Sequence, residues 1–166
     1  YAQLARICKA TETRLLLDAS GAPLKKALDE GVYLVKPNLR EFGEITDSGL
    51  ETTDEQRDAC RELISSGAAD VIALTLGKAG ACIAWPDGFF HSDVPQVKVQ
   101  STIGAGDSSM AGIALGLSRG WDIPRTFLLA LAAGTAAVKT PASELCEPEE
   151  VEALFERLLE DNRERL

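Results

Sequence analysis

The sequence predicts an α/β fold with a mostly parallel sheet and helices on both of its faces. Short apolar segments of strand length alternate along the chain with longer segments whose apolar residues recur at helical spacing. This alternation is typical of βαβ units, which build parallel sheets covered by helices. The 166 residues with 45% hydrophobic content are enough for one sizeable core, so we expect a single domain over residues 1–166.

The first half of the chain begins with a helical segment at residues 1–10. Residues 14–20 (RLLLDAS) and 32–38 (VYLVKPN) are expected strands, and the segment between them has the length of a helix that Gly31 closes. A third helix is expected with Thr53 as its cap and Gly67 as its stop. Its apolar residues at helical spacing are Ala59, Cys60, Leu63 and Ile64.

The middle of the chain reads as strands. DVIALTLG (70–77) is expected to be a buried strand, and the segment 80–95 a hairpin that turns at Pro86-Asp87-Gly88. The alternating segment VKVQST (97–102) is predicted to be a further strand.

The last third is predicted to be helical. One helix begins near Asp107, and residues 123–140 form a helix that is apolar nearly all round and therefore buried. The last helix starts among acidic residues, which the positive end of a helix dipole favours. The predicted stripe of the first of these helices is Met110, Ile113, Ala114 and Leu117, and that of the last is Val151, Leu154, Phe155, Leu158 and Leu159.

Composition argues against several classes of partner. The net charge of −9 and a pI near 4.7 disfavour binding to the phosphate backbone of nucleic acids. The longest apolar run (126–138) is too short to span a membrane. The four cysteines are scattered without a C-x-x-C pair, which indicates neither a zinc site nor a disulfide framework. Free thiols in a reducing cytoplasm are therefore expected.

Chemistry is expected where strands end, because ligands of open α/β sheets bind beyond the carboxyl ends of their strands. KPNLRE places Lys36, Asn38 and Glu41 after one strand. TLGKAGA places Thr75, with two glycines behind it, after another. Each segment taken alone is also typical of an ordinary turn.

A third strand end, QSTIGAGDSSM (100–110), has the pattern of an anion hole. Gly104-Ala105-Gly106 leads into a helix whose first backbone amides have no intrahelical partner, and these amides and the helix dipole bind phosphate. Asp107 has two interpretations: it caps the helix, or it accepts the proton of an attacking hydroxyl during phosphoryl transfer. The dinucleotide pattern G-x-G-x-x-G and the Walker pattern G-x-x-x-x-G-K-[ST] are both absent.

These segments together resemble the ribokinase-like (PfkB-type) carbohydrate kinases over essentially the whole chain. STIGAGDS is similar to the carboxy-terminal signature of that family, KPNLRE to its N-x-x-E motif, and TLGKAGA to its [ST]-x-G-x-x-G nucleotide loop, in matching order and spacing. KPN, QSTIGAGDS, AAGTAA and ELC are most similar to the type-2 6-phosphofructokinase branch. Tagatose-6-phosphate kinases and 1-phosphofructokinases share most of this pattern.

The resemblance implies a three-layer α/β/α ribokinase-like (Rossmann-like) fold and a kinase that uses ATP and Mg²⁺. It implies Asp107 as general base and the backbone of Gly104, Ala105 and Gly106 as the anion hole for the γ-phosphoryl group. Asn38 and Glu41 would organise Mg²⁺, whose preferred ligands are oxygens. The residues implied to contact the nucleotide are Lys36, Asn38, Thr75, Gly77, Gly80, Gly134 and Thr135.

The resemblance also implies a K⁺ site formed by the carbonyls of Ser101 and Ile103. For Gly134 and Thr135, simple helix packing is the alternative interpretation. Relatives often have aspartate where Ser101 stands, although the phosphofructokinase branch has serine.

The chain is expected to be the carboxy-terminal part of a larger kinase, without the amino-terminal half and the small sheet that lids the site. The expected acceptor is a phosphorylated ketohexose, with fructose-6-phosphate as the first candidate, and the complete protein is expected to be a cytoplasmic homodimer. The alternatives are a 1-phosphofructokinase or tagatose-6-phosphate kinase, a nucleotide-binding fragment that transfers nothing, and a purely structural α/β module.

Overall fold

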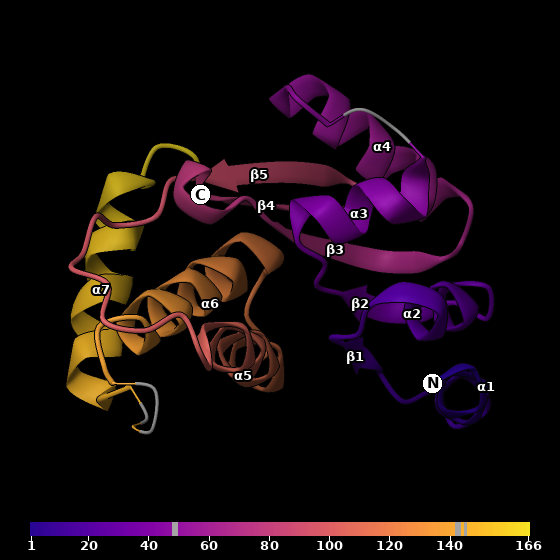
Figure 1. Cartoon of the computed structure of the whole chain (residues 1–166), viewed down its shortest axis with the longest axis horizontal. Helices are drawn as coiled ribbons and strands as arrows, with labels where there is room; N and C mark the ends of the chain where they lie inside the picture. Colours follow the sequence, from indigo (N-terminus) through magenta and orange to yellow (C-terminus); the bar gives the residue numbers. More distant parts are fainter. Residues whose placement is uncertain (48–49, 142–143, 145) are drawn as a thin grey trace. The chain divides into compact units, whose positions relative to one another are not determined.

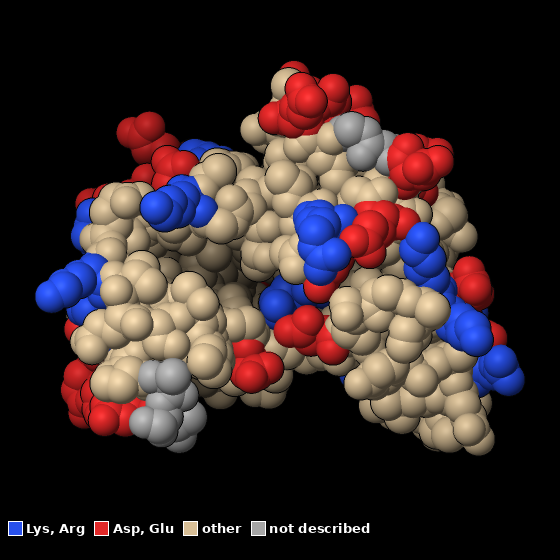
Figure 2. Space-filling view, in the orientation of Figure 1, with Lys and Arg blue, Asp and Glu red and all other residues tan. Residues whose placement is uncertain are grey.

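The computed structural model describes residues 1–47, 50–141, 144 and 146–166, and the chain divides into two compact units, Tyr1–His91 and Ser92–Leu166. Leu145, in the middle of ELC, lies outside the described residues. None of the helices in the described ranges has the length and apolar character needed to cross a membrane. In Figure 2, acidic and basic side chains are both present on the visible face, with uncharged surface between them.

The first unit is an α/β structure built on a five-stranded sheet with the order β1-β2-β3-β4-β5 (Figure 1). Strands β1, β2 and β3 are parallel, and β4 returns antiparallel to β3. This confirms the α/β class and the mostly parallel sheet. The elements are α1 (Ala2–Ala10), β1 (Leu16–Leu17), α2 (Gly21–Leu28), β2 (Val32–Val35), α3 (Leu39–Thr46), α4 (Thr53–Ser65), β3 (Ala69–Thr75), the 3₁₀ turn η1 (Gly77–Ala79), β4 (Ala81–Trp85) and β5 (Gly88–Ser92).

The core of this unit includes buried residues of its helices and strands, and one part of it lies where α4 packs on β3 and β4 and α3 packs on β3. Phe42 of α3 and Cys60 of α4 are fully buried there, against strand residues such as Leu74 and Cys82. A hydrogen bond with Cys82 and burial both raise the pKa of the Cys60 thiol far above its ordinary value. All four cysteines are free, as the scattered spacing predicted.

Two helix starts in this unit differ from the prediction. Helix α3 was not predicted, although Asn38 and Glu41 form a complete capping box at its start. Helix α4 is capped by Thr52, one residue earlier than the predicted Thr53. The Thr52 hydroxyl accepts a hydrogen bond from the Glu55 amide, and the Glu55 carboxylate accepts one from the Thr52 amide. Thr53 lies three residues before Gln56, which suits a capping box equally well, but the Gln56 side chain is buried and donates to the Leu50 carbonyl instead.

The second unit consists of helices α5 (Ala105–Ser118), α6 (Ile123–Ala137) and α7 (Pro148–Asp161), preceded by an irregular segment. The predicted strand at 97–102 is wrong. The amides of Gln100 and Ser101 donate to the carbonyl of Val138, at the end of α6, instead of to a strand. The predicted burial of α6 is confirmed, since eleven of its residues are buried.

Helices α5 and α6 pack closely through small side chains. The buried residues of α5 are Ser109, Gly112, Ile113 and Gly116. Of the predicted stripe, Ile113 is therefore buried, Met110 and Leu117 are half-buried, and Ala114 is exposed. A Cβ atom on Gly112 would lie 2.8 Å from the Cα of Ala130. The contact therefore requires residues without bulk, which a search for large apolar residues overlooks. On α7, the buried residues Leu154, Phe155 and Leu158 agree with the predicted stripe.

Candidate functional site

The two motifs of the first unit meet at the carboxyl ends of β2 and β3. Asn38 and Thr75 form an isolated parallel bridge beyond these strands, and the Thr75 amide donates to the carbonyl of Pro37 over 3.1 Å. The Thr75 hydroxyl points at the same carbonyl, 3.4 Å away. Because the strands are parallel and adjacent, two sequence segments 38 residues apart are brought to one edge.

Lys36 is held by an ion pair that the sequence did not predict. Its ammonium lies 2.9 Å from a carboxylate oxygen of Asp18, and its side chain is only 8% exposed while that of Asp18 is 39% exposed. Asp18 follows β1, the strand next to β2, so it reaches the same edge of the sheet. The rule that strand ends carry chemistry would have found Asp18 had it been applied to RLLLDAS.

Asn38 and Glu41 have a structural task at the start of α3. The Asn38 side-chain oxygen accepts from the Glu41 amide at 2.9 Å, and one Glu41 carboxylate oxygen accepts from the Asn38 amide at 3.0 Å. A carboxylate has two oxygens and about four acceptor positions, so Glu41 retains capacity for a second partner. Its oxygens suit Mg²⁺, and Asp18 adds a second carboxylate at this edge, one oxygen of which is paired with Lys36.

The described residues contain no group of three or more His, Cys, Asp or Glu side chains that could hold a metal by themselves. Mg²⁺ in phosphoryl-transfer sites commonly keeps several waters and is bound through one or two carboxylates and the phosphates of the nucleotide. The oxygens of Glu41 and Asp18 fit that mode of binding, in which the protein supplies few direct ligands.

The loop after Thr75 is shaped by its glycines. Gly77 has φ 61° and Gly80 has φ 96°, both in the region that favours glycine. The Leu76 amide donates to the Gly80 carbonyl over 3.0 Å, which closes the loop around η1. Gly77 is exposed, so backbone is accessible to a flat ligand at this point.

In the second unit, helix α5 begins as an anion hole requires. Gly104 is the N-cap with φ 82°, and the first helical hydrogen bond runs from the Ser108 amide to the Gly104 carbonyl. The amides of Gly106 and Asp107 come before this bond, where helix donors point out of the helix start. A Cβ atom on Gly104 would meet no atom within 4 Å, so it is the positive φ that calls for glycine.

Asp107 is the third residue of α5 and its side chain is exposed. The N-cap of this helix makes no side-chain capping bond. Asp107 therefore does not act as the cap, although its charge is favourable in the first turn of the helix.

The other predicted residues of this unit lie around the same helix start. The Ser101 hydroxyl accepts from the Ile103 amide over 3.1 Å. A Cβ atom on Gly134 would lie 3.2 Å from the Ala105 carbonyl oxygen, so Gly134 packs directly under the first turn of α5. Thr135 is 7% exposed within α6.

The structure thus gathers the predicted residues into two groups, one in each compact unit. The first group, at the carboxyl ends of β2 and β3, holds Lys36, Asn38, Glu41, Thr75, Gly77 and Gly80. The second group, at the start of α5, holds Ser101, Ile103, Gly104, Ala105, Gly106, Asp107 and Gly134, and Thr135 follows Gly134 within α6.

Comparison with known proteins finds kinases. The family model described as pfkB family carbohydrate kinase matches residues 1–150. ATP-dependent 6-phosphofructokinase isozyme 2 of Mycobacterium tuberculosis is 40% identical over 157 residues, which is 94% of this chain and 46% of the relative. A 1-phosphofructokinase of Bacillus subtilis is 32% identical over 82% of this chain and 45% of the relative. The chain spans about half the length of the curated relatives it matches.

Solved structures agree with this comparison. The crystal structure of phosphofructokinase-2 from Escherichia coli in complex with potassium has a TM-score of 0.89 and 31% identity, over 95% of this chain and 51% of that one. The Arabidopsis thaliana ribokinase structure has a TM-score of 0.81 at 22% identity, over 93% of this chain and 51% of that one, and this likeness shows the fold alone. The predicted ribokinase-like fold is confirmed.

Proposed function

Because the chain belongs to the pfkB family of carbohydrate kinases, we propose that it carries the ATP-binding groups and the catalytic base of a kinase for phosphorylated ketohexoses. Fructose-6-phosphate is the first candidate acceptor, since relatives named 6-phosphofructokinase isozyme 2 are up to 40% identical. One observation carries the proposal: a left-handed glycine N-cap opens α5, with Asp107 exposed in the first turn.

The proposed base is Asp107, which accepts the proton of the acceptor hydroxyl as the oxygen attacks the γ-phosphorus of ATP. The amides of Gly104, Ala105 and Gly106 donate to the transferring phosphoryl oxygens and stabilise the charge that spreads over them. The φ of 82° at Gly104 sets the direction in which the chain enters α5. The backbone amides at the start of the helix are therefore oriented before the substrate binds.

In this proposal the residues of the first group also contact nucleotide. Lys36, held by Asp18, neutralises phosphate charge, and Asn38 and Glu41 orient the waters around Mg²⁺. Thr75, Gly77 and Gly80 present backbone to the nucleotide, and Gly134 and Thr135 lie toward the adenine. When bound, Mg²⁺ screens the phosphate charge that an attacking oxygen would otherwise meet.

We also propose a K⁺ site at the carbonyls of Ser101 and Ile103, a homodimer and a cytoplasmic location for the full-length protein. One solved structure of E. coli phosphofructokinase-2 is a complex with potassium, and another is its tetrameric inhibited form. If turnover is unchanged when K⁺ is replaced by a large organic cation, the K⁺ site is wrong.

Light scattering of the full-length protein measures the oligomeric state, and a mass other than that of two chains would contradict the homodimer.

The decisive experiment compares Asp107→Asn with Asp122→Asn in the full-length protein. Asp122 also stands at a helix start, where it caps α6 by accepting from the Arg125 amide at 2.8 Å, and asparagine caps equally well. Asp107→Asn is expected to lower turnover of fructose-6-phosphate by about 10²–10⁴-fold while MgATP affinity is retained. Asp122→Asn is expected to leave both unchanged. Full turnover in Asp107→Asn would rule out this residue as the base.

Two rival functions remain distinguishable by the same assays. A protein that binds nucleotide without transferring phosphate would show calorimetric MgATP binding, lost in Gly106→Val, and no turnover with any ketohexose phosphate. A 1-phosphofructokinase or a tagatose-6-phosphate kinase would turn over its own substrate with a higher kcat/KM than fructose-6-phosphate. Because the chain is 32% identical to a 1-phosphofructokinase, the substrate of that enzyme is the first alternative to assay.

A further inference from the structure

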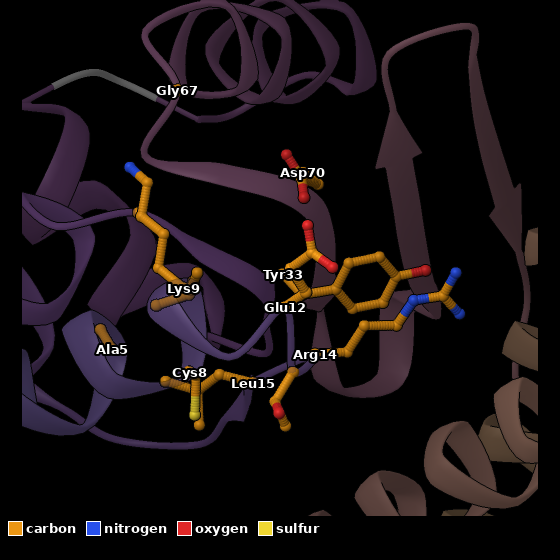
Figure 3. Close-up of a pocket in the computed structure, with 12 residues that line it drawn as sticks. Ala5, Cys8, Lys9, Glu12, Arg14, Leu15, Tyr33, Gly67 and Asp70 are labelled. Carbon is orange, nitrogen blue, oxygen red and sulfur yellow. The ribbon is translucent and has the colours of Figure 1, made fainter.

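A cavity of about 400 Å³ opens in the first unit, at the opposite end of the parallel strands from Lys36 and Thr75 (Figure 3). It is lined where the chain enters β1, β2 and β3, at residues such as Leu15, Val32 and Asp70. Gly31 and Gly67, with φ 84° and 79°, form tight turns beside it. Its size lies within the range of small-molecule sites, and the proposed kinase function does not use it.

Four charged side chains line this cavity: Lys9, Glu12, Arg14 and Asp70. Within the part of the chain that the structure describes, none of the four takes part in an ion pair. Arg14 is held by a cation–π contact instead, with its guanidinium 4.7 Å from the centre of the Tyr33 ring. Lys9 donates to the Glu30 carbonyl over 3.3 Å.

The backbone at Glu12 is unusual. Its φ of 52° is left-handed, at the position after a helix where glycine is strongly preferred. The Thr13 amide donates to the Cys8 carbonyl and the Glu12 amide to the Lys9 carbonyl, which is the bonding of a Schellman end to α1. Glycine would make the same turn without strain, but only glutamate brings a carboxylate to the cavity.

In Figure 3 the carboxylates of Glu12 and Asp70 point toward one another, with Lys9 to one side and Arg14 to the other. Two carboxylates that share a space repel each other unless a cation lies between them. Apolar surface from Ala5, Leu15 and the Tyr33 ring adjoins these charges and suits an alkyl chain. The two flanking cations disfavour a ligand that carries positive charge alone.

We propose that this cavity binds a small zwitterion of the amino-acid class. Its ammonium group lies between Glu12 and Asp70, and its carboxylate is bound by Arg14, whose planar guanidinium suits a carboxylate. The ammonium offsets one of the two carboxylate charges and the ligand's carboxylate offsets that of Arg14. One negative charge then remains opposite Lys9, whose ammonium donates to the Glu30 carbonyl.

The proposal is tested by calorimetric titration of the full-length protein with three matched compounds. The compounds are 6-aminohexanoate, hexanoate and hexylamine, which carry both charged groups or only one of them. The zwitterion is expected to bind at least tenfold more tightly than either single-charge compound. Equal affinities for the three compounds, or no binding by any of them, would overturn the proposal.

A pair of variants separates binding from folding. Glu12→Gly is expected to raise the thermal midpoint, because glycine relieves the left-handed backbone, and to weaken 6-aminohexanoate binding at least tenfold. Arg14→Gln is expected to abolish the preference for the zwitterion over hexylamine. The control Glu156→Gln removes an exposed charge from α7 and is expected to leave both quantities unchanged. Wild-type affinity in Glu12→Gly contradicts the assignment.

Discussion

Asn38 and Glu41 are residues with a demonstrable role in the fold and a proposed role at the site. Their reciprocal hydrogen bonds cap α3, so the N-x-x-E spacing that suggests a magnesium motif is also a capping box. Serine caps a helix as well as asparagine does, which allows the two roles to be separated. Asn38→Ser is therefore expected to keep the stability of the protein, whereas Asn38→Ala loses about 1 kcal/mol.

The measurement is urea unfolding of both variants, with the Mg²⁺ concentration for half-maximal turnover measured in the full-length protein. Both substitutions are expected to raise that concentration by a similar factor, because both remove the amide. A normal Mg²⁺ requirement in Asn38→Ser, together with normal stability, would leave Asn38 with the capping role alone.

Glu55 is the corresponding residue of the second capping box. Hydrogen bonds from the Thr52 backbone and side chain lower the pKa of Glu55 below the ordinary value of 4.5. A lowered pKa in the folded state stabilises the protein above the ordinary value, and this contribution is lost as the pH falls through the folded-state pKa. We expect Glu55→Gln to be less stable than the wild type at pH 7 and equally stable in acid below that folded-state pKa.

Urea unfolding at several pH values checks this expectation. Glu62→Gln is the matched control, since it removes one exposed negative charge from the same helix. A stability difference between Glu55→Gln and wild type that stays constant down to acid pH would contradict the linkage to Glu55.

At the scale of elements, the contact between α5 and α6 depends on the absence of side chains. A Cβ atom on Gly112 would lie 2.8 Å from the Ala130 Cα, which is backbone and cannot rotate away. Gly112→Ala is expected to destabilise the protein by about 1–3 kcal/mol, despite the higher helix propensity of alanine. Ala111→Ser, at an exposed position of the same helix, is expected to change stability by less than about 0.5 kcal/mol.

Gly134→Ala extends this test to the start of α5. Its Cβ would lie 3.2 Å from both the Ala105 carbonyl oxygen and the Ser109 hydroxyl, so a shift of a few tenths of an ångström would accommodate it. The stability loss is expected to be smaller than for Gly112→Ala, with weaker MgATP binding because the first turn of α5 moves. An unfolding midpoint in Gly134→Ala below that in Gly112→Ala would reverse this order.

At the scale of the whole molecule, the four cysteines report which parts of the chain are packed. Cys60 and Cys82 are fully buried, and the raised pKa of Cys60 keeps its thiol protonated and unreactive. Cys8 and Cys146 are half-buried. We expect an aromatic disulfide reagent at pH 8 to label two thiols rapidly and the other two only as the first unit unfolds.

The double variant Cys8→Ser, Cys146→Ser is expected to lose the rapid phase and keep the slow one. Adding urea should accelerate the slow phase in parallel with the unfolding rate. Rapid labelling of all four thiols in the absence of urea would mean that the core around Cys60 opens far more often than its packing implies.

Much of the fold follows from local chemistry that the sequence displays. The apolar segments at 32–35 and 69–75 are strands because continuous β-branched and aliphatic residues suit buried parallel strands. The buried helix at 123–137 follows from apolar residues on all its faces. The glycines before Asp107 predicted a helix start with free donors, and Gly104 adopts the conformation that this start requires.

The predictions that failed share a different cause. In each case the outcome depends on a contact with residues that are distant in sequence. Residues 97–102 alternate like a strand, but the amides of Gln100 and Ser101 find the Val138 carbonyl. Helix α5 buries its glycines because α6 comes close enough to exclude larger residues. The role of Asp18 depends on β1 lying beside β2, which alternation alone leaves undecided.

The sequence by itself determined the α/β class, the order of most elements and the segments in which chemistry is expected, because helix periodicity, glycine conformation and capping patterns act over a few residues. Only the tertiary structure decided that Asn38 lies against Thr75, that Asp18 holds Lys36 and that Gly134 supports the first turn of α5. Those contacts depend on strand order and on helix separation. Both depend on how the whole core packs. A short segment of sequence does not determine that packing, because the residues it packs against are distant in the chain.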